Sequence, residues 1–201
     1  MAMDQSFSQD LEKWLKSNKP KTVLSLGEVF AEKSFAVAFL ILMFLPSLPL
    51  PTGGISHVFE LIVMLLALEL LIGRHVIWLP KRWRGKKLSE RTTKKAIPFI
   101  IRRVRWFERF ARPRFTKTMQ NDRFIHSVGL VVFVYTLAAF LAPPFSGLDT
   151  LPSFGVVVIS LGLILEDGLI YIMGLISGAI GIFLSVVFGA ALAEAISRLF
   201  S

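Results

Sequence analysis

The sequence contains no cysteine and only three histidines among its 201 residues. The absence of cysteine excludes a disulfide framework, thiol catalysis and a metal site built on thiolates. No residue spacing supports a Ser/His/Asp triad, a cluster of metal ligands or a phosphate-binding glycine loop. We therefore predict no metal, no cofactor and no enzymatic activity.

Charged residues are missing from two long stretches of the chain. Between Ser34 and Gly73 the only His, Asp, Glu, Lys or Arg side chains are His57, Glu60 and Glu69. From residue 128 to residue 165 the only such side chain is Asp149. With 54% hydrophobic residues overall, this pattern predicts an integral membrane protein. The first 33 residues are polar and mixed in charge, unlike a cleaved secretory signal.

Basic residues gather between the two apolar stretches. Residues 74–125 hold 17 of the 23 Lys and Arg side chains and only three acids. Charge alone would allow nucleic-acid binding, but the membrane context favours a cytoplasmic segment that contacts anionic lipid headgroups. We expect no nucleic-acid partner. The predicted headgroup contacts are Trp78, Trp83, Arg102, Arg103, Arg105 and Arg109.

Amphipathic patterns predict helices that lie flat on the membrane surface. Residues 97–111 place apolar side chains on one face, with arginines between them. Near the N-terminus, Phe7, Leu11 and Trp14 share a face at helical spacing. A capping-box pattern at residues 25–28 predicts the start of a second short helix that leads into the first apolar stretch.

Each apolar stretch is interrupted at a corresponding place by proline and glycine. A run of 14 residues without charge (35–48 or 128–141) precedes each break, and an apolar helix ending near a glycine follows it. Each run measures about 21 Å as a helix, too short to cross a hydrocarbon core of roughly 30 Å unless the helix extends into its polar flank. We expect two re-entrant hairpins whose tips meet around a polar space; ordinary periplasmic turns are the alternative. The breaks contain Pro46, Pro49, Pro51, Gly53, Gly54, Pro143, Pro144 and Gly147.

The chain ends in a long apolar stretch, residues 169–200, which can form one tilted helix or two shorter ones. Gly174 and Gly178 form a small-residue pattern that predicts close helix packing and a homodimer.

The predicted fold is therefore an all-α, polytopic integral membrane protein. It combines two Pro/Gly-broken helical hairpins, a C-terminal membrane helix or pair of helices, and interfacial amphipathic helices. The expected segments are 1–33 (amphipathic), 34–73 (first hairpin), 74–125 (basic, cytoplasmic), 126–168 (second hairpin, a repeat of the first) and 169–201 (C-terminal).

Four short motifs resemble the ExoD family of bacterial exopolysaccharide-synthesis proteins. They are LP-x-LPLP at 45–51, GRHVIWLPKRW at 73–83, RFARPRF at 109–115 and LEDG at 165–168. The resemblance covers roughly residues 22–190, and its most specific pieces are the Trp78-Leu79-Pro80 turn and the Asp167-Gly168 pair. Glu69 stands where the family pattern leads us to expect glutamine. The resemblance implies an inner-membrane protein linked to exopolysaccharide production, without catalytic residues to transfer.

Five ionisable residues form the candidate polar site: His57, Glu60, Asp149, Glu166 and Asp167. His57 and Glu60 are three residues apart and share a helix face, as a proton- or substrate-binding pair would require. Both can instead lie at the outer interface in contact with water. Asp149 also fits a helix cap, and Glu166 with Asp167 also fits an ordinary helix stop before glycine.

Three functions remain open from the sequence. The matched, interrupted hairpins favour a transporter-like component with a site between them. The basic segment and the glycine-faced last helix would equally suit a non-catalytic scaffold or regulator of an exopolysaccharide assembly complex. An enzyme acting on a lipid-linked sugar is disfavoured, because the sequence offers no convergent acid/base set.

Overall fold

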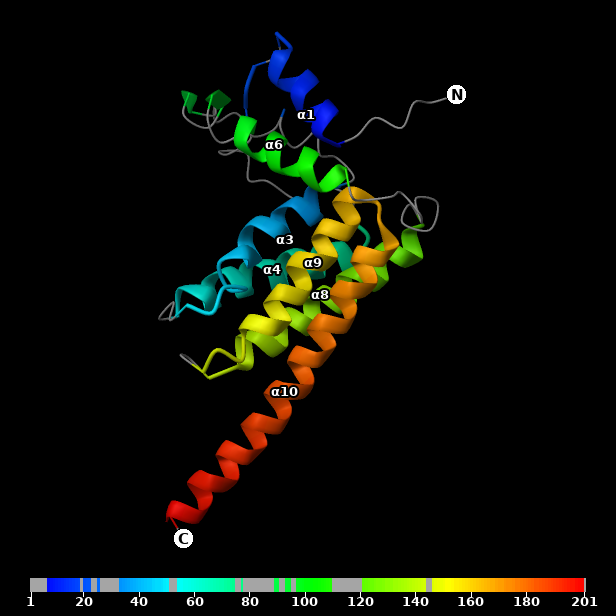
Figure 1. Cartoon of the computed structure of the whole chain (residues 1–201). Helices are drawn as coiled ribbons and strands as arrows, with labels where there is room; N and C mark the ends of the chain where they lie inside the picture. The colour runs from blue at the N-terminus through cyan, green and yellow to red at the C-terminus, as the bar shows by residue number, and fades with distance from the viewer. Residues whose placement is uncertain are drawn as a thin grey trace.

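The computed structural model is all-α, with seven helices in the part of the chain that it describes (Figure 1). The described residues are 7–18, 20–22, 25, 33–50, 54–74, 77, 89–90, 93–94, 97–109, 121–143 and 146–200. The helices are α1 (Phe7–Lys16), α3 (Ser34–Phe44), α4 (Ile55–Leu71), α6 (Ile97–Glu108), α8 (Asp122–Leu141), α9 (Thr150–Leu165) and α10 (Gly168–Phe200). The predicted helical fold class is confirmed.

The two hairpins pack crosswise on each other. The first is α3 with α4 and the second is α8 with α9; α3 lies against α9, and α4 lies against α8. Helix α10 covers α9. Both hairpin turns lie at one end of this bundle, which we call the tip end, while α1 and α6 lie at the opposite end (Figure 1).

Helix α8 is longer than its charge-free run. It begins at Asp122, six residues before the predicted start, because the side chain of Asn121 caps it by accepting a hydrogen bond from the Arg123 N–H at 3.0 Å. Its 20 residues give about 30 Å, enough to cross a hydrocarbon core. In the second hairpin the helix therefore extends into its polar flank and is long enough to span, whereas α3 has only 11 residues.

The turns between hairpin limbs use the predicted breaker residues. Gly54 and Gly147 have φ angles of +89° and +70°, a conformation that favours glycine. Pro46 is fully buried, whereas Pro49 and Pro143 are exposed. Pro51, Gly53 and Pro144 lie outside the described residues.

Glycines bring α9 and α10 into close contact. A Cβ atom added to Gly155 would lie 2.5 Å from the Cα atom of Gly178, and one added to Gly174 would lie 2.5 Å from the Ile159 backbone nitrogen. The small-residue surface that suggested a homodimer through Gly174 and Gly178 is therefore used for packing within the chain, where it covers α9.

Within the described parts of the chain, two helices, α8 and α10, are long and apolar enough to cross a membrane. The stretch 168–200 forms one continuous helix of 33 residues, not two short ones. The outward faces of α4 and α10 carry exposed apolar side chains, including Leu61 and Leu65 on α4 and Ile176 and Ile180 on α10. Exposed apolar surface of this extent is typical of a helix bundle surrounded by lipid.

Helices α1 and α6 cover each other's apolar faces. Leu11 and Trp14 of α1 pack with Ile97 and Ile101 of α6 in one buried cluster. The prediction that both faces lie on the bilayer is corrected here, since two amphipathic helices can remove their apolar stripes from water by pairing. Among the predicted headgroup contacts, the side chains of Arg102, Arg105 and Arg109 are exposed. Trp78, Trp83, the Arg103 side chain and residues 26–28 of the predicted capping box lie outside the described part.

Candidate functional site

The tip end of the bundle contains a buried carboxylate paired with a histidine. His57 and Glu60 lie in the first two turns of α4, and the distance from His57 Nδ1 to Glu60 Oε2 is 2.7 Å. Glu60 is 0% exposed, and the His57 side chain is 25% exposed. The second carboxylate oxygen of Glu60, Oε1, is buried without a hydrogen-bond partner. Such an oxygen is costly to keep and marks a functional-site candidate.

Residues from the second hairpin surround this pair. The ring of Phe140, near the end of α8, lies 5.5 Å from the His57 ring. Asp149 immediately precedes α9 and lies within electrostatic range of both His57 and Glu60. The Ser153 hydroxyl, one turn into α9, is a second buried oxygen without a partner. We call His57, Glu60 and Asp149 the tip site. Asp149 occupies the predicted cap position, but its side chain makes no capping hydrogen bond.

Glu166 and Asp167 lie at the other end of α9. That helix has 16 residues, so about 24 Å separates them from Asp149 along its axis. Glu166 forms an ion pair with Lys33 at 2.6 Å and adopts a left-handed φ of +54°. Asp167 caps α10 by accepting the Leu169 N–H at 2.9 Å. Their inclusion in one polar site with His57 is therefore wrong, because both residues form the turn between two antiparallel helices.

Glu69 is also remote from the tip site. It lies near the last turn of α4, where Arg74 is 3.7 Å from its carboxylate. Glu69 is nine positions after Glu60, and this separation places the two side chains on different faces of one helix.

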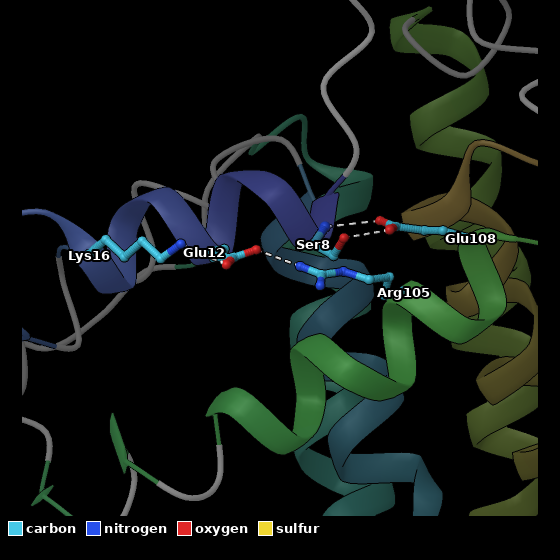
Figure 2. A network of polar contacts seen from close by, with 5 residues as sticks. All are labelled: Ser8, Glu12, Lys16, Arg105 and Glu108. Carbon is cyan, nitrogen blue, oxygen red and sulfur yellow. Dashed lines mark hydrogen bonds and ion pairs between the residues drawn. The ribbon is translucent and has the colours of Figure 1, made fainter.

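A polar network joining α1 to α6 was not predicted from the sequence (Figure 2). The Ser8 N–H and hydroxyl donate to the two carboxylate oxygens of Glu108, at 2.9 and 2.5 Å. In the opposite sense, Arg105 donates to Glu12 at 2.5 Å, and Lys16 pairs with the other Glu12 oxygen at 2.9 Å. The hydrogen bonds from Lys16 and Arg105 lower the pKa of Glu12 below its usual value of 4.5.

The helical spacing was the available signal for this network. Ser8 and Glu12 are one turn apart on α1, and Arg105 and Glu108 are one turn apart on α6. Each pair projects from one helix face, so two facing helices can make both contacts at once. An open surface pocket of about 420 Å³ lies beside the network. Its lining contains Ser8, Gln9, Glu12, Arg105, Glu108 and Arg109.

In the described ranges, no group of three or more His, Asp or Glu residues could hold a metal ion. The tip site offers two carboxylates and one imidazole around a buried position. Such a set can bind a proton or a cationic group and can accept hydrogen bonds.

Comparisons with known proteins agree on one family. The family described as "Exopolysaccharide synthesis, ExoD" matches residues 7–187. An uncharacterized protein of Synechocystis sp. is 30% identical over 175 residues, covering 84% of this chain and 80% of its own. Protein ExoD of Rhizobium meliloti is 31% identical over 141 residues, covering 66% of this chain and 54% of its own. No solved structure matches. With a family match that spans both hairpins, the chain belongs to the ExoD family.

Proposed function

We propose that this chain is a transporter-like membrane component of exopolysaccharide synthesis, with its binding site at the tip end. The observation that carries the proposal is Glu60, a fully buried carboxylate with one oxygen unpartnered. Ionisable groups inside a membrane bundle are retained where they bind a solute or a proton. The family description supplies the link to exopolysaccharide synthesis.

The crosswise packing of the hairpins supports this proposal. If α3 corresponds to α8 and α4 corresponds to α9, then the α3–α9 contact and the α4–α8 contact are equivalent. Two hairpins with such equivalent contacts are related by an approximate twofold axis, as are the halves of transporters built from parallel repeats. The tip site has contributions from both halves, with His57 and Glu60 from the first and Asp149 from the second.

The proposed topology follows from charge. The basic segment 74–125 stays in the cytoplasm with α6, and both tips face the other side of the inner membrane. The exposed arginines of α6 then contact anionic headgroups at the cytoplasmic surface. In this arrangement, the tip site opens toward the periplasm.

A functional test compares two carboxylates within α4. We expect Glu60→Gln and His57→Ala to lower exopolysaccharide output strongly in cells that depend on this protein. Glu69→Gln is the matched control, because Glu69 pairs with Arg74 at the far end of the same helix and should leave output unchanged. Protein levels in the membrane fraction must be equal for all three variants. Wild-type output from both tip-site variants would instead favour a scaffold or regulator of an assembly complex.

Labelling of single cysteines tests the location of the tips. The sequence lacks cysteine, so there is no background. Leu50 and Ser146 are exposed positions beside the two turns, and Ser146 avoids the strained φ of Gly147. We expect Leu50→Cys and Ser146→Cys to react with an impermeant reagent added to intact cells. Protection of both, with labelling only after lysis, would contradict the proposed topology.

A further inference from the structure

His57 connects the buried Glu60 carboxylate with the surroundings of the tip site. The Glu60 side chain is 0% exposed, so a saccharide or other large solute cannot touch it in this conformation. The imidazole of His57 is 25% exposed, and its Nδ1 atom lies 2.7 Å from Glu60 Oε2. A proton is the ligand that can pass along such a hydrogen bond without opening the bundle.

The interior beyond Glu60 offers no continuation for a proton path in the described core. The next buried positions on α4 are Val63 and Ala67, which pack against Val132 of α8. The Ser153 hydroxyl lies at the tip end, one turn into α9, and the other buried Ser and Thr hydroxyls of α8 and α9 each donate to their own helix backbone. These bonds run from Thr136 to the Val132 carbonyl and from Ser160 to the Val156 carbonyl, both at 2.7 Å. Glu60 therefore connects with the tip end alone.

The charges around Glu60 favour a positive ligand. Asp149, before α9, adds a second carboxylate within electrostatic range. Helix α3 carries no ionisable side chain, and α8 carries none between Tyr135 and its end at Leu141. His57 is thus the one basic group among the described residues that face Glu60 from α3, α4, α8 and α9. An anion would meet two carboxylates without a compensating Lys or Arg.

We propose that His57 relays protons between the tip end and Glu60, which makes Glu60 a proton-binding site accessible from that side only. A proton from water binds His57 Nε2, and the proton on Nδ1 moves to Glu60 Oε2. The imidazole is then neutral with its proton on Nε2, and the carboxyl group is neutral. Release follows the same two transfers in reverse. No other reactant is required. The inference rests on the proposed function only in taking the tip end to face water.

The test measures proton exchange at Glu60 directly. Full-length protein is placed in lipid nanodiscs and moved from H₂O to D₂O, and the C=O stretch of protonated carboxyl groups is followed by infrared spectroscopy. We expect Glu60→Gln to remove one exchanging band, and Glu69→Gln to leave it in place. His57→Asn should keep the band but slow its exchange about 100-fold, because an amide can hydrogen bond to Oε2 but cannot relay a proton.

His57→Phe and a change of salt provide two further tests of the proton relay. His57→Phe preserves an aromatic ring against Phe140 and should slow the exchange as His57→Asn does. Wild-type exchange rates in either folded His57 variant would overturn the relay. If replacing choline chloride by sodium chloride shifts the Glu60 band, the ligand is a metal cation and the proton assignment fails.

The two proposals fail separately. Slowed exchange together with normal exopolysaccharide output would keep the proton site and remove the transport role. Reduced output in Glu60→Gln together with unchanged exchange in both His57 variants would keep a functional tip site and remove the relay.

Discussion

At the scale of single residues, Glu12 makes the contact between α1 and α6 dependent on pH. Its pKa is lowered from 4.5, chiefly by hydrogen bonds from Lys16 and Arg105. A lowered folded-state pKa means that the stabilisation is present above the unfolded value of 4.5 and is lost as the pH falls through the lower folded-state pKa. The effect is modest, because the Glu12 side chain is partly exposed to solvent, which screens its ion pairs.

We therefore predict that α1 detaches more readily in acid. The protection factors for amide hydrogen exchange of residues 7–16, corrected for the intrinsic exchange rate at each pH, should fall when the pH drops from neutral to below 4.5, while those of α9 stay constant. Glu12→Gln is the control: its protection factors in α1 should already be lower at neutral pH and should change less on acidification. An identical pH response in the wild type and in Glu12→Gln would show that another group controls the contact.

At the scale of elements, the close approach of α9 and α10 predicts a strong difference between two glycines. A Cβ atom at Gly155 would lie 2.5 Å from the backbone of Gly178, so Gly155→Ala must push the helices apart. We expect it to lower the free energy of unfolding by about 1–3 kcal/mol. Gly189→Ala is the control, since nothing lies within 4 Å of its added Cβ. It should be neutral or stabilising by up to about 1 kcal/mol from helix propensity.

Thermal unfolding of the purified protein in one detergent measures both variants. Both variants replace glycine by alanine inside an apolar α-helix, so the type of substitution cannot explain a difference in their unfolding temperatures. Equal unfolding temperatures for Gly155→Ala and Gly189→Ala would contradict the close packing of α9 on α10.

The elements that could be predicted from the sequence are those with local signals. Proline and glycine at positions 46–54 and 143–147 predicted both hairpin turns, because these residues interrupt a helix at their own positions. The start of α8 was missed because the charge-free run began at Val128, while the cap at Asn121 sits in a polar flank. The pairing of α1 with α6 was missed because periodicity identifies an apolar face but not what covers it.

The candidate site shows the same division between local and distant information. The contact between His57 and Glu60 follows from their spacing of three residues on one helix. That Glu60 is fully buried, and that one of its oxygens has no partner, depends on how α8 and α9 pack around α4. Glu166 and Asp167 were grouped with the site by their charge, yet a 16-residue helix separates them from Asp149.

At the scale of the whole molecule, α10 connects the two ends of the bundle and extends past the tips. It begins at Gly168, at the α1–α6 end, and Ser185 donates to the Leu148 carbonyl at 3.1 Å beside the second turn. The helix continues from there to Phe200 (Figure 1). If α10 crosses the membrane as one span, this direction puts Phe200 on the same side of the membrane as the tips.

We predict that Phe200 lies outside the cytoplasm. Alkaline phosphatase fused after Phe200 should be active, because that enzyme folds in the periplasm, and green fluorescent protein fused there should be dark. Fusions after Ser89, within the basic segment, should show the reverse pattern. Fluorescence at both positions would mean that α10 does not cross the bilayer as one span. The periplasmic location of the tips would then lose its support, and the proposed orientation of the tip site would be wrong.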